Sequence, residues 1–341
     1  MKNRLCELFG IRYPIVQAPM AYITWADLAA AVSNAGGLGT MGPNPGPGFQ
    51  EEMPPVEQAG ELLRREIRRL RDMTRHPFAV NFTIGRGKQI PYSDRFVEVG
   101  CEERVPVAIV SMGSSAVYTE KLKAAGCKVL HAVGAVKHAV KAQADGVDAV
   151  VCEGYEGGGH LGGEELTTMV MVPQVVDAVD IPVVAGGGIA DARGLVAALA
   201  LGADGVYMGT RFMATKECFV HPNVKRAVVE ATDTSTVAFG RMVMLSRSLK
   251  NKYTEGHMAL EAKGATFDQM RDFERSGTPE LKGRRRTAAA NVDGNLEWGT
   301  VGMGAIAGLI KEVAGAADVI QALMEGSPKV MKRLQEVLPS R

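Results

Sequence analysis

The chain has 341 residues, of which 46% are hydrophobic and 23% charged, a balance typical of a globular protein with a substantial core. Its 39 basic and 38 acidic residues give a formal charge of +1. This excludes a global electrostatic footprint for nucleic acid or an anionic membrane. We therefore expect a small-molecule ligand and neither nucleic acid nor membrane as a partner.

The five cysteines are scattered, odd in number and without a CxxC pair, so we expect reduced thiols rather than disulfides or a structural zinc site. The N-terminus lacks a long apolar segment, and no stretch approaches about 18 uninterrupted apolar residues. These features predict a cytoplasmic protein without a signal peptide or a transmembrane helix.

Short apolar runs recur along the first 210 residues, each followed by a segment with helical spacing. Such runs, rich in Val and Ile and apolar on both faces, are typical of parallel strands buried between layers. The expected strands are 15–20, 38–41, 78–82, 107–111, 128–133, 149–153, 182–187 and 205–209. The expected helices between them are 24–36, 56–74, 114–126, 135–146, 167–179 and 191–202.

Eight βα units predict the α/β class and a (β/α)8 TIM barrel. An open Rossmann sheet is the alternative, but no GxGxxG motif follows the first strand, where IVQAPMAYIT stands instead. After the eighth strand the chain becomes charged and helical, which predicts a mainly helical insertion over one end of the barrel. We assign residues 1–216 and 301–341 to the barrel and 217–300 to the insertion.

Glycines follow the last two expected strands, in AGGGI (185–189) and MGTRF (208–212). In such barrels these two loops often bind a phosphate, because bared backbone N–H groups form an anion site. The alternative is that the glycines only make tight turns. We favour a phosphate site because both loops carry the pattern, with candidate residues Gly186, Gly187, Gly188, Met208, Gly209 and Thr210.

The sixth strand runs directly into GYEGGGHLGG, so His160 is expected at the same rim of the barrel. Glycines give this histidine few packing partners, which favours an acid–base or hydrogen-bonding role over a structural one. His76, His138, His221 and His257 are interpreted as surface or structural residues, and His131 as intermediate.

Two further residues are weaker candidates for binding a flat heterocycle. Met20, in the APM at the end of the first strand, suits packing against an aromatic ligand but equally suits the core. Asn81, at the end of the third strand, has an amide that can hydrogen-bond a heterocycle or merely form a turn. No HExxH, GxSxG or Walker motif is present, which disfavours metal hydrolysis and acyl-enzyme chemistry.

In combination, these motifs resemble the nitronate monooxygenase and FMN-dependent enoyl reductase superfamily. The resemblance is carried by APM, FAVN, GVDAVVCEGYEGGGHLGG and IPVVAGGGIADARGLVAALALGADGVYMGTRF, and it resumes at SRSLKN and GAIAGLIKEV. It implies a TIM barrel that binds FMN, with NADH or NADPH as a transient reductant and a homodimer as a possible assembly.

The resemblance also implies the site residues. It places Met20 at the isoalloxazine, Asn81 and Glu153 at its polar edge or the ribityl chain, Gly158 and Gly159 beside the flavin, and Gly187, Gly188, Gly209 and Thr210 around the phosphate. Further cofactor-binding candidates are Ala18, Pro19, Gly186 and Met208. His160 matches the active-site histidine. Glu153 stands where a glutamine is common, and Ala305 replaces the glutamine of a GQ pair.

Two chemistries share this frame. One is an NAD(P)H-dependent ene or enoyl reductase, which reduces the C=C bond of an unsaturated carbonyl such as an acyl thioester or an aromatic enone. The other is a nitronate monooxygenase, with a quinone reductase and a flavin-binding barrel without turnover as further alternatives. We favour the reductase because PFAVNF after a long helix, and GAIAGLIKEV followed by ADVIQALMEG, resemble that branch more closely.

Overall fold

The barrel is built by eight short parallel strands in the computed structural model, which describes residues 3–46, 53–281 and 283–338. The strands are β1 (Ile15–Gln17), β2 (Gly39–Met41), β3 (Phe78–Thr83), β4 (Val107–Ser111), β5 (Lys128–Val133), β6 (Ala149–Glu153), β8 (Val183–Gly186) and β9 (Gly205–Met208). They pair in the order β1-β9-β8-β6-β5-β4-β3-β2. A parallel bridge between Val16 and Leu38 joins the two ends of the sheet, and the predicted TIM barrel is confirmed.

Apolar side chains fill both faces of the barrel wall, which explains why the strands are apolar runs rather than alternating patterns. Along β4, Val107 and Ile109 belong to the inner cluster, whereas Ala108 and Val110 pack outward against the helices. The inner cluster continues into α1 (Arg4–Phe9), whose Leu5 is fully buried at the start of β9. This helix therefore closes the amino-terminal end of the barrel.

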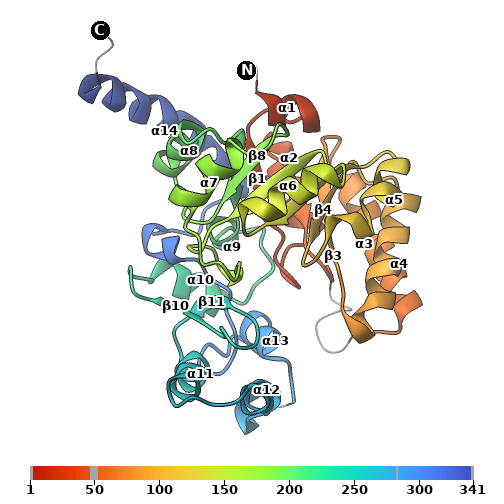
Figure 1. Cartoon of the computed structure of the whole chain (residues 1–341), viewed down its shortest axis with the longest axis vertical. Coiled ribbons are helices and arrows are strands. Elements are labelled where there is room, and N and C mark those ends of the chain that lie inside the picture. The colour runs from red at the N-terminus through yellow and green to blue at the C-terminus, as the bar shows by residue number, and fades with distance from the viewer. Residues whose placement is uncertain (1–2, 47–52, 282, 339–341) are drawn as a thin grey trace.

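Helices surround the wall (Figure 1). The expected ones are α2 (Ala26–Asn34), α3 (Val56–Met73), α5 (Thr119–Ala124), α6 (Val136–Ala144), α7 (Thr168–Val176) and α8 (Ala192–Ala200), and α4 (Ile90–Glu102) is an additional one. The short helix α9 (Thr210–Met213) follows β9, and much later in the chain η5 (Ala305–Leu309) precedes the long α14 (Ala316–Val337). Short 3-10 turns lie at Gly87–Gln89, Ser115–Val117 and Pro279–Leu281.

The segment after α9 lies at one end of the barrel, with α1 and α14 at the other (Figure 1). It contains α10 (Pro222–Val229), α11 (Lys252–Ala262), α12 (Phe267–Arg275) and α13 (Arg286–Asn291), in agreement with its expected helical character. It also contains two strands that the sequence did not predict, β10 (Thr236–Phe239) and β11 (Ser246–Leu249). These pair with each other and with β7 (Gly159–His160) in a small antiparallel sheet. Among the described helices, none is long and apolar enough to cross a membrane.

Candidate active site

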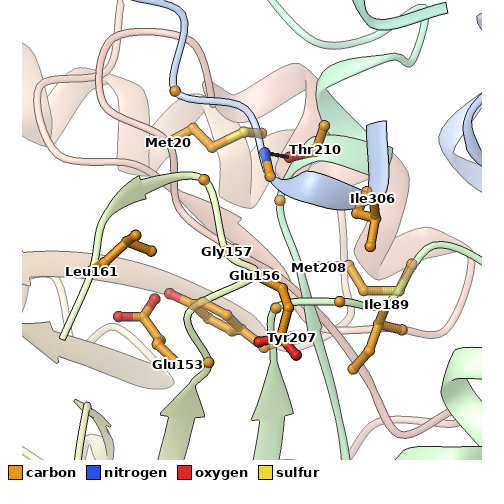
Figure 2. Close-up of a pocket in the computed structure, with 18 of the residues that line it drawn as sticks. Met20, Glu153, Glu156, Gly157, Leu161, Ile189, Tyr207, Met208, Thr210 and Ile306 are labelled. Carbon is orange, nitrogen blue, oxygen red and sulfur yellow. Dashed lines mark hydrogen bonds between the residues drawn. The ribbon is translucent and has the colours of Figure 1, made fainter. Parts of the chain in front are cut away.

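One cavity lies at the carboxyl ends of β1, β6, β8 and β9 (Figure 2). Its volume is about 100 Å³. The residues predicted from the sequence that line it are Ala18, Pro19, Met20, Glu153, Gly158, His160, Gly187, Gly188, Met208, Gly209 and Thr210. The topology therefore brings residues from four strand ends into a single site.

The turn after β8 offers backbone N–H groups to a ligand. Gly187 and Gly188 have φ values of 88° and 73°, which L side chains rarely adopt. A Cβ at Gly187 would lie 3.0 Å from the carbonyl oxygen of Gly154. Within the described part of the chain neither N–H of this turn has a hydrogen-bond acceptor, so both are available to an anion.

A hydrogen-bond network behind this turn holds its shape. The backbone N–H of Thr168, the first residue of α7, donates to both carboxylate oxygens of Glu156, at 3.1 and 2.9 Å. The Thr168 hydroxyl lies 3.1 Å from the Gly186 carbonyl, 3.0 Å from the Gly187 carbonyl and 3.1 Å from Glu156 Oε2. The Glu156 carboxylate thus accepts a free N–H at the N-terminus of α7 and offsets the positive end of the helix dipole. The Thr168 hydroxyl connects that helix to the glycine turn.

The segment around Gly304, nearly one hundred residues after Thr210 in the chain, completes the cavity wall. Gly304 N–H donates to the Thr210 hydroxyl oxygen at 3.0 Å (Figure 2), and Ala305 N–H donates to the Glu156 carbonyl at 2.9 Å. A Cβ at Gly158 would lie 2.5 Å from the Gly304 nitrogen, so the two loops touch through their backbones. Because Thr210 accepts from Gly304, its own hydroxyl hydrogen is left for another acceptor.

The small antiparallel sheet, rather than the barrel, holds His160. β7 pairs with β11 so that His160 lies opposite Ser246, and Leu161 N–H donates to the Leu245 carbonyl at 2.9 Å. The His160 side chain is exposed where it lines the cavity. The protein around the imidazole lowers its pKa by desolvation, so the ring is uncharged at neutral pH.

Glu153 ends β6, and its carboxyl lies beside the ring of Tyr207 from β9 (Figure 2). Burial raises the pKa of Glu153 to about 7. Burial, and secondarily the charge of Glu153, raises the pKa of Tyr207 well above its ordinary value. The cavity floor therefore contains a carboxyl group that changes its protonation state near neutral pH.

Asn81, Gly159 and Gly186 were predicted for the site but do not line the cavity. Asn81 is buried and its amide nitrogen donates to the Ile109 carbonyl at 2.9 Å and to the Ser111 hydroxyl at 3.2 Å. Gly159 is paired in β7, and Gly186 leaves room for the Tyr207 ring, which a Cβ would approach to 3.2 Å. None of the three reaches this cavity.

The cavity also has walls that sequence reasoning missed. They are Gly154, Glu156, Gly157, Leu161, Ile189, Tyr207, Gly302, Gly304 and Ile306. Glu156 stands inside the glycine-rich stretch after β6, and its acidic side chain between glycines was an available signal. Tyr207 lies within an apolar strand, where nothing marked it as a cavity residue. Gly304 begins GAIAGLIKEV, where the family resemblance resumes, but that motif did not indicate a place in the cavity wall.

Comparison with known proteins identifies the family. The model of the nitronate monooxygenase family matches residues 2–326. The chain belongs to the nitronate monooxygenase family. This family and the FabK-like proteins form one FMN-dependent, enoyl reductase-like superfamily of oxidoreductase enzymes.

Three similar proteins illustrate the breadth of this superfamily. The (3aS,4S,5R,7aS)-5-hydroxy-7a-methyl-1-oxo-octahydro-1H-indene-4-carboxyl-CoA dehydrogenase of Mycobacterium tuberculosis is 33% identical, covering 95% of each chain. The structure of FabK from Thermotoga maritima superposes with a TM-score of 0.86 at 36% identity, covering 99% of both chains. A nitroalkane oxidase from Streptomyces ansochromogenes has a TM-score of 0.79 at 26% identity, covering 97% of this chain and 99% of the oxidase.

The cavity fits the flavin mononucleotide on which the family depends. The unpartnered N–H groups of Gly187 and Gly188 and the free hydroxyl hydrogen of Thr210 suit its phosphate. Backbone donors rather than basic side chains would hold the cofactor here.

Proposed function

We propose that this protein is an NAD(P)H-dependent ene reductase that uses FMN to reduce the C=C bond of an α,β-unsaturated acyl thioester. The observation that carries the proposal is the position of His160, an uncharged, exposed imidazole on the cavity wall that is fixed by β11 of the insertion. Such a ring can donate a hydrogen bond to a carbonyl oxygen without bringing a charge into the site.

Two comparisons support a thioester substrate and the reductase chemistry. The name of the mycobacterial relative contains a carboxyl-CoA, which is an acyl thioester. The name also specifies dehydrogenation, which is the reverse of the hydrogenation proposed here. The superposition with FabK covers 99% of this chain and therefore includes the segment 217–300. The similarity therefore extends over the part of the chain that lies at the barrel mouth, where an extended acceptor would be covered.

When bound, FMN would supply hydride transfer from the nicotinamide to the β-carbon of the acceptor, and a proton from solvent would complete the reduction at the α-carbon. The chain's own residues orient the acceptor. A ring N–H of His160 would donate to the thioester carbonyl oxygen, drawing electron density from the double bond and favouring attack at the β-carbon. The glycine turn and Thr210 would anchor the phosphate end, which fixes the distance between the two reacting partners.

The deciding experiment is an anaerobic spectrum of the FMN-loaded protein. We expect NADH or NADPH to bleach the flavin absorbance, and crotonyl-CoA or an aromatic enone to restore it. Turnover that requires oxygen and an alkyl nitronate and ignores nicotinamide would instead establish a nitronate monooxygenase, which the family match also supports. Reoxidation by a quinone alone would indicate a quinone reductase, and FMN binding without any bleaching would indicate a barrel without turnover.

A further inference from the structure

Glu153 is a carboxyl group without a partner in a cavity built for an anion. Its side chain lines the cavity, and no hydrogen bond or ion pair to it exists within the described part of the chain. The neighbouring glutamate in the same wall, Glu156, has three hydrogen bonds from Thr168. Within the described residues, the Glu156 carboxylate therefore has hydrogen-bond donors, whereas the Glu153 carboxyl has none.

No cation lies in the cavity wall to compensate Glu153. The titratable side chains among the lining residues are those of Glu153, Glu156, His160 and Tyr207, and none of the lining residues is lysine or arginine. Tyr207, from β9, stays neutral because its pKa is raised, and His160, from β7, is uncharged at neutral pH. The segments of β1, β8 and residues 302–306 contribute only apolar residues, glycine and proline.

We propose that Glu153 is a proton-linked binding residue, so that the cavity takes up a proton on the Glu153 carboxylate when it binds FMN. The reason is that the ligand brings a phosphate of about two negative charges and displaces water from the cavity. Both changes disfavour an ionised carboxylate that has no cation beside it. A glutamine side chain at this position has no ionisable group, so neither change would affect it.

Linkage fixes the sign of the pH dependence. Burial already raises the pKa of Glu153 to about 7, so close to half of the free protein carries this proton at neutral pH. If binding raises the pKa further, the dissociation constant for FMN rises as pH increases above about 7, by up to about tenfold per pH unit. It levels off once the pH exceeds the pKa of the bound form.

The test measures FMN binding to the cofactor-free full chain by quenching of flavin fluorescence between pH 6.5 and 9. For the natural chain we expect affinity to fall with rising pH, whereas Glu153→Gln should lose most of this dependence. The phosphate of FMN, with a second pKa of about 6, titrates identically in both proteins and is removed by the comparison. Glu120→Gln, at an exposed position of α5, is the matched control, and it should retain the pH dependence of the natural chain because its carboxylate lies outside the cavity.

A second measurement needs no variant. Isothermal titration calorimetry at pH 7.5, in two buffers of different ionisation enthalpy, reports proton uptake directly, and we expect about a half to three quarters of a proton per FMN. Proton release, or equal pH profiles for the natural chain and Glu153→Gln, would overturn the proposal. It rests on the proposed function only for the identity of the ligand. If FMN fails to bind at any pH, the proposed function fails; if FMN binds without proton uptake, only this inference fails.

Discussion

The guanidinium of Arg247 donates to the backbone carbonyl of Tyr155 from two nitrogens, at 3.2 and 3.3 Å, and lies 5.0 Å from the centre of the Tyr155 ring. Arg247 belongs to β11, where it also pairs with Gly159. One residue of the insertion therefore holds both ends of the glycine-rich loop that leads to His160. Residues of the segment 217–300 therefore position the loop that carries His160, in addition to lying over the mouth of the barrel.

Replacing Arg247 should disturb the position of His160 without emptying the FMN site. We expect Arg247→Ala to lower kcat at least tenfold with FMN content unchanged, because the loop loses two hydrogen bonds and a stacked group. Arg247→Lys should recover little, since an ammonium cannot provide the paired donors or the planar stack. Stopped-flow reoxidation checks this, with the exposed Arg65→Ala in α3 as the control. Equal rates for Arg247→Ala and the control would contradict it.

The barrel could be predicted from sequence because its strands are buried on both faces and leave continuous apolar runs. All eight expected strands occur, with ends shifted by a few residues. Helix α4 was missed because it follows a glycine-rich loop and begins with Ile90-Pro91. Strands β10 and β11 were missed because their burial depends on pairing with β7, so β11 shows only one buried residue, Ser248.

The site was predictable where function requires glycine at the ends of strands. The turns at Gly187 and Gly209 and the loop carrying His160 were all found in this way. Tyr207 was not, because a strand residue inside the barrel and one lining its mouth look alike in sequence. The contribution of Gly304 depends on a chain segment returning from the insertion, and no local pattern encodes that return.

Removing the imidazole should separate binding from turnover. We expect His160→Ala to keep its FMN, because the phosphate donors expected at Gly187, Gly188 and Thr210 are unchanged, and to lose about 100-fold or more in the rate of flavin reoxidation by the unsaturated acceptor. The exposed His138→Ala on α6 is the matched control. Because desolvation lowers the pKa of His160 below 6.5, the imidazole stays neutral above that value, and titration of His160 should not change the rate in the natural chain there. An unchanged rate in His160→Ala would show that the residue is structural.

The Thr168 hydroxyl should matter to the phosphate turn although it does not line the cavity. Thr168→Val keeps the shape of the side chain but leaves the Gly186 and Gly187 carbonyls without its hydrogen bond. We expect a loss of about 1–2 kcal/mol in the free energy of unfolding and weaker FMN binding. Chemical denaturation and fluorescence titration measure the two effects. Thr167→Val is the matched control, because the Thr167 side chain makes no capping hydrogen bond; similar losses in both variants would refute the argument.

Adding one methyl group at the turn tests the anion cradle directly. Gly187→Ala forces an L side chain into a φ of 88° and places its Cβ 3.0 Å from the Gly154 carbonyl oxygen. We expect FMN affinity to fall at least tenfold and stability to fall by about 1–2 kcal/mol. Gly163→Ala is the control, since Gly163 has an ordinary φ and a Cβ there would have no atom within 4 Å. Tight FMN binding by Gly187→Ala would argue against a phosphate at this turn.

The raised pKa of Glu153 should also appear in the stability of the cofactor-free protein. The unfolded chain releases this proton near pH 4.5, whereas the folded chain keeps it to about pH 7. Between these values the folded state binds more protons, so the contribution of Glu153 to stability falls as pH rises and is lowest above about pH 7. The loss is about 1–2 kcal/mol, because Glu153 is only half-buried in the folded chain. Thermal unfolding of the natural chain and of Glu153→Gln from pH 5 to 8 checks this: the natural chain should lose Tm relative to the variant, and parallel curves would mean that the carboxyl is not desolvated.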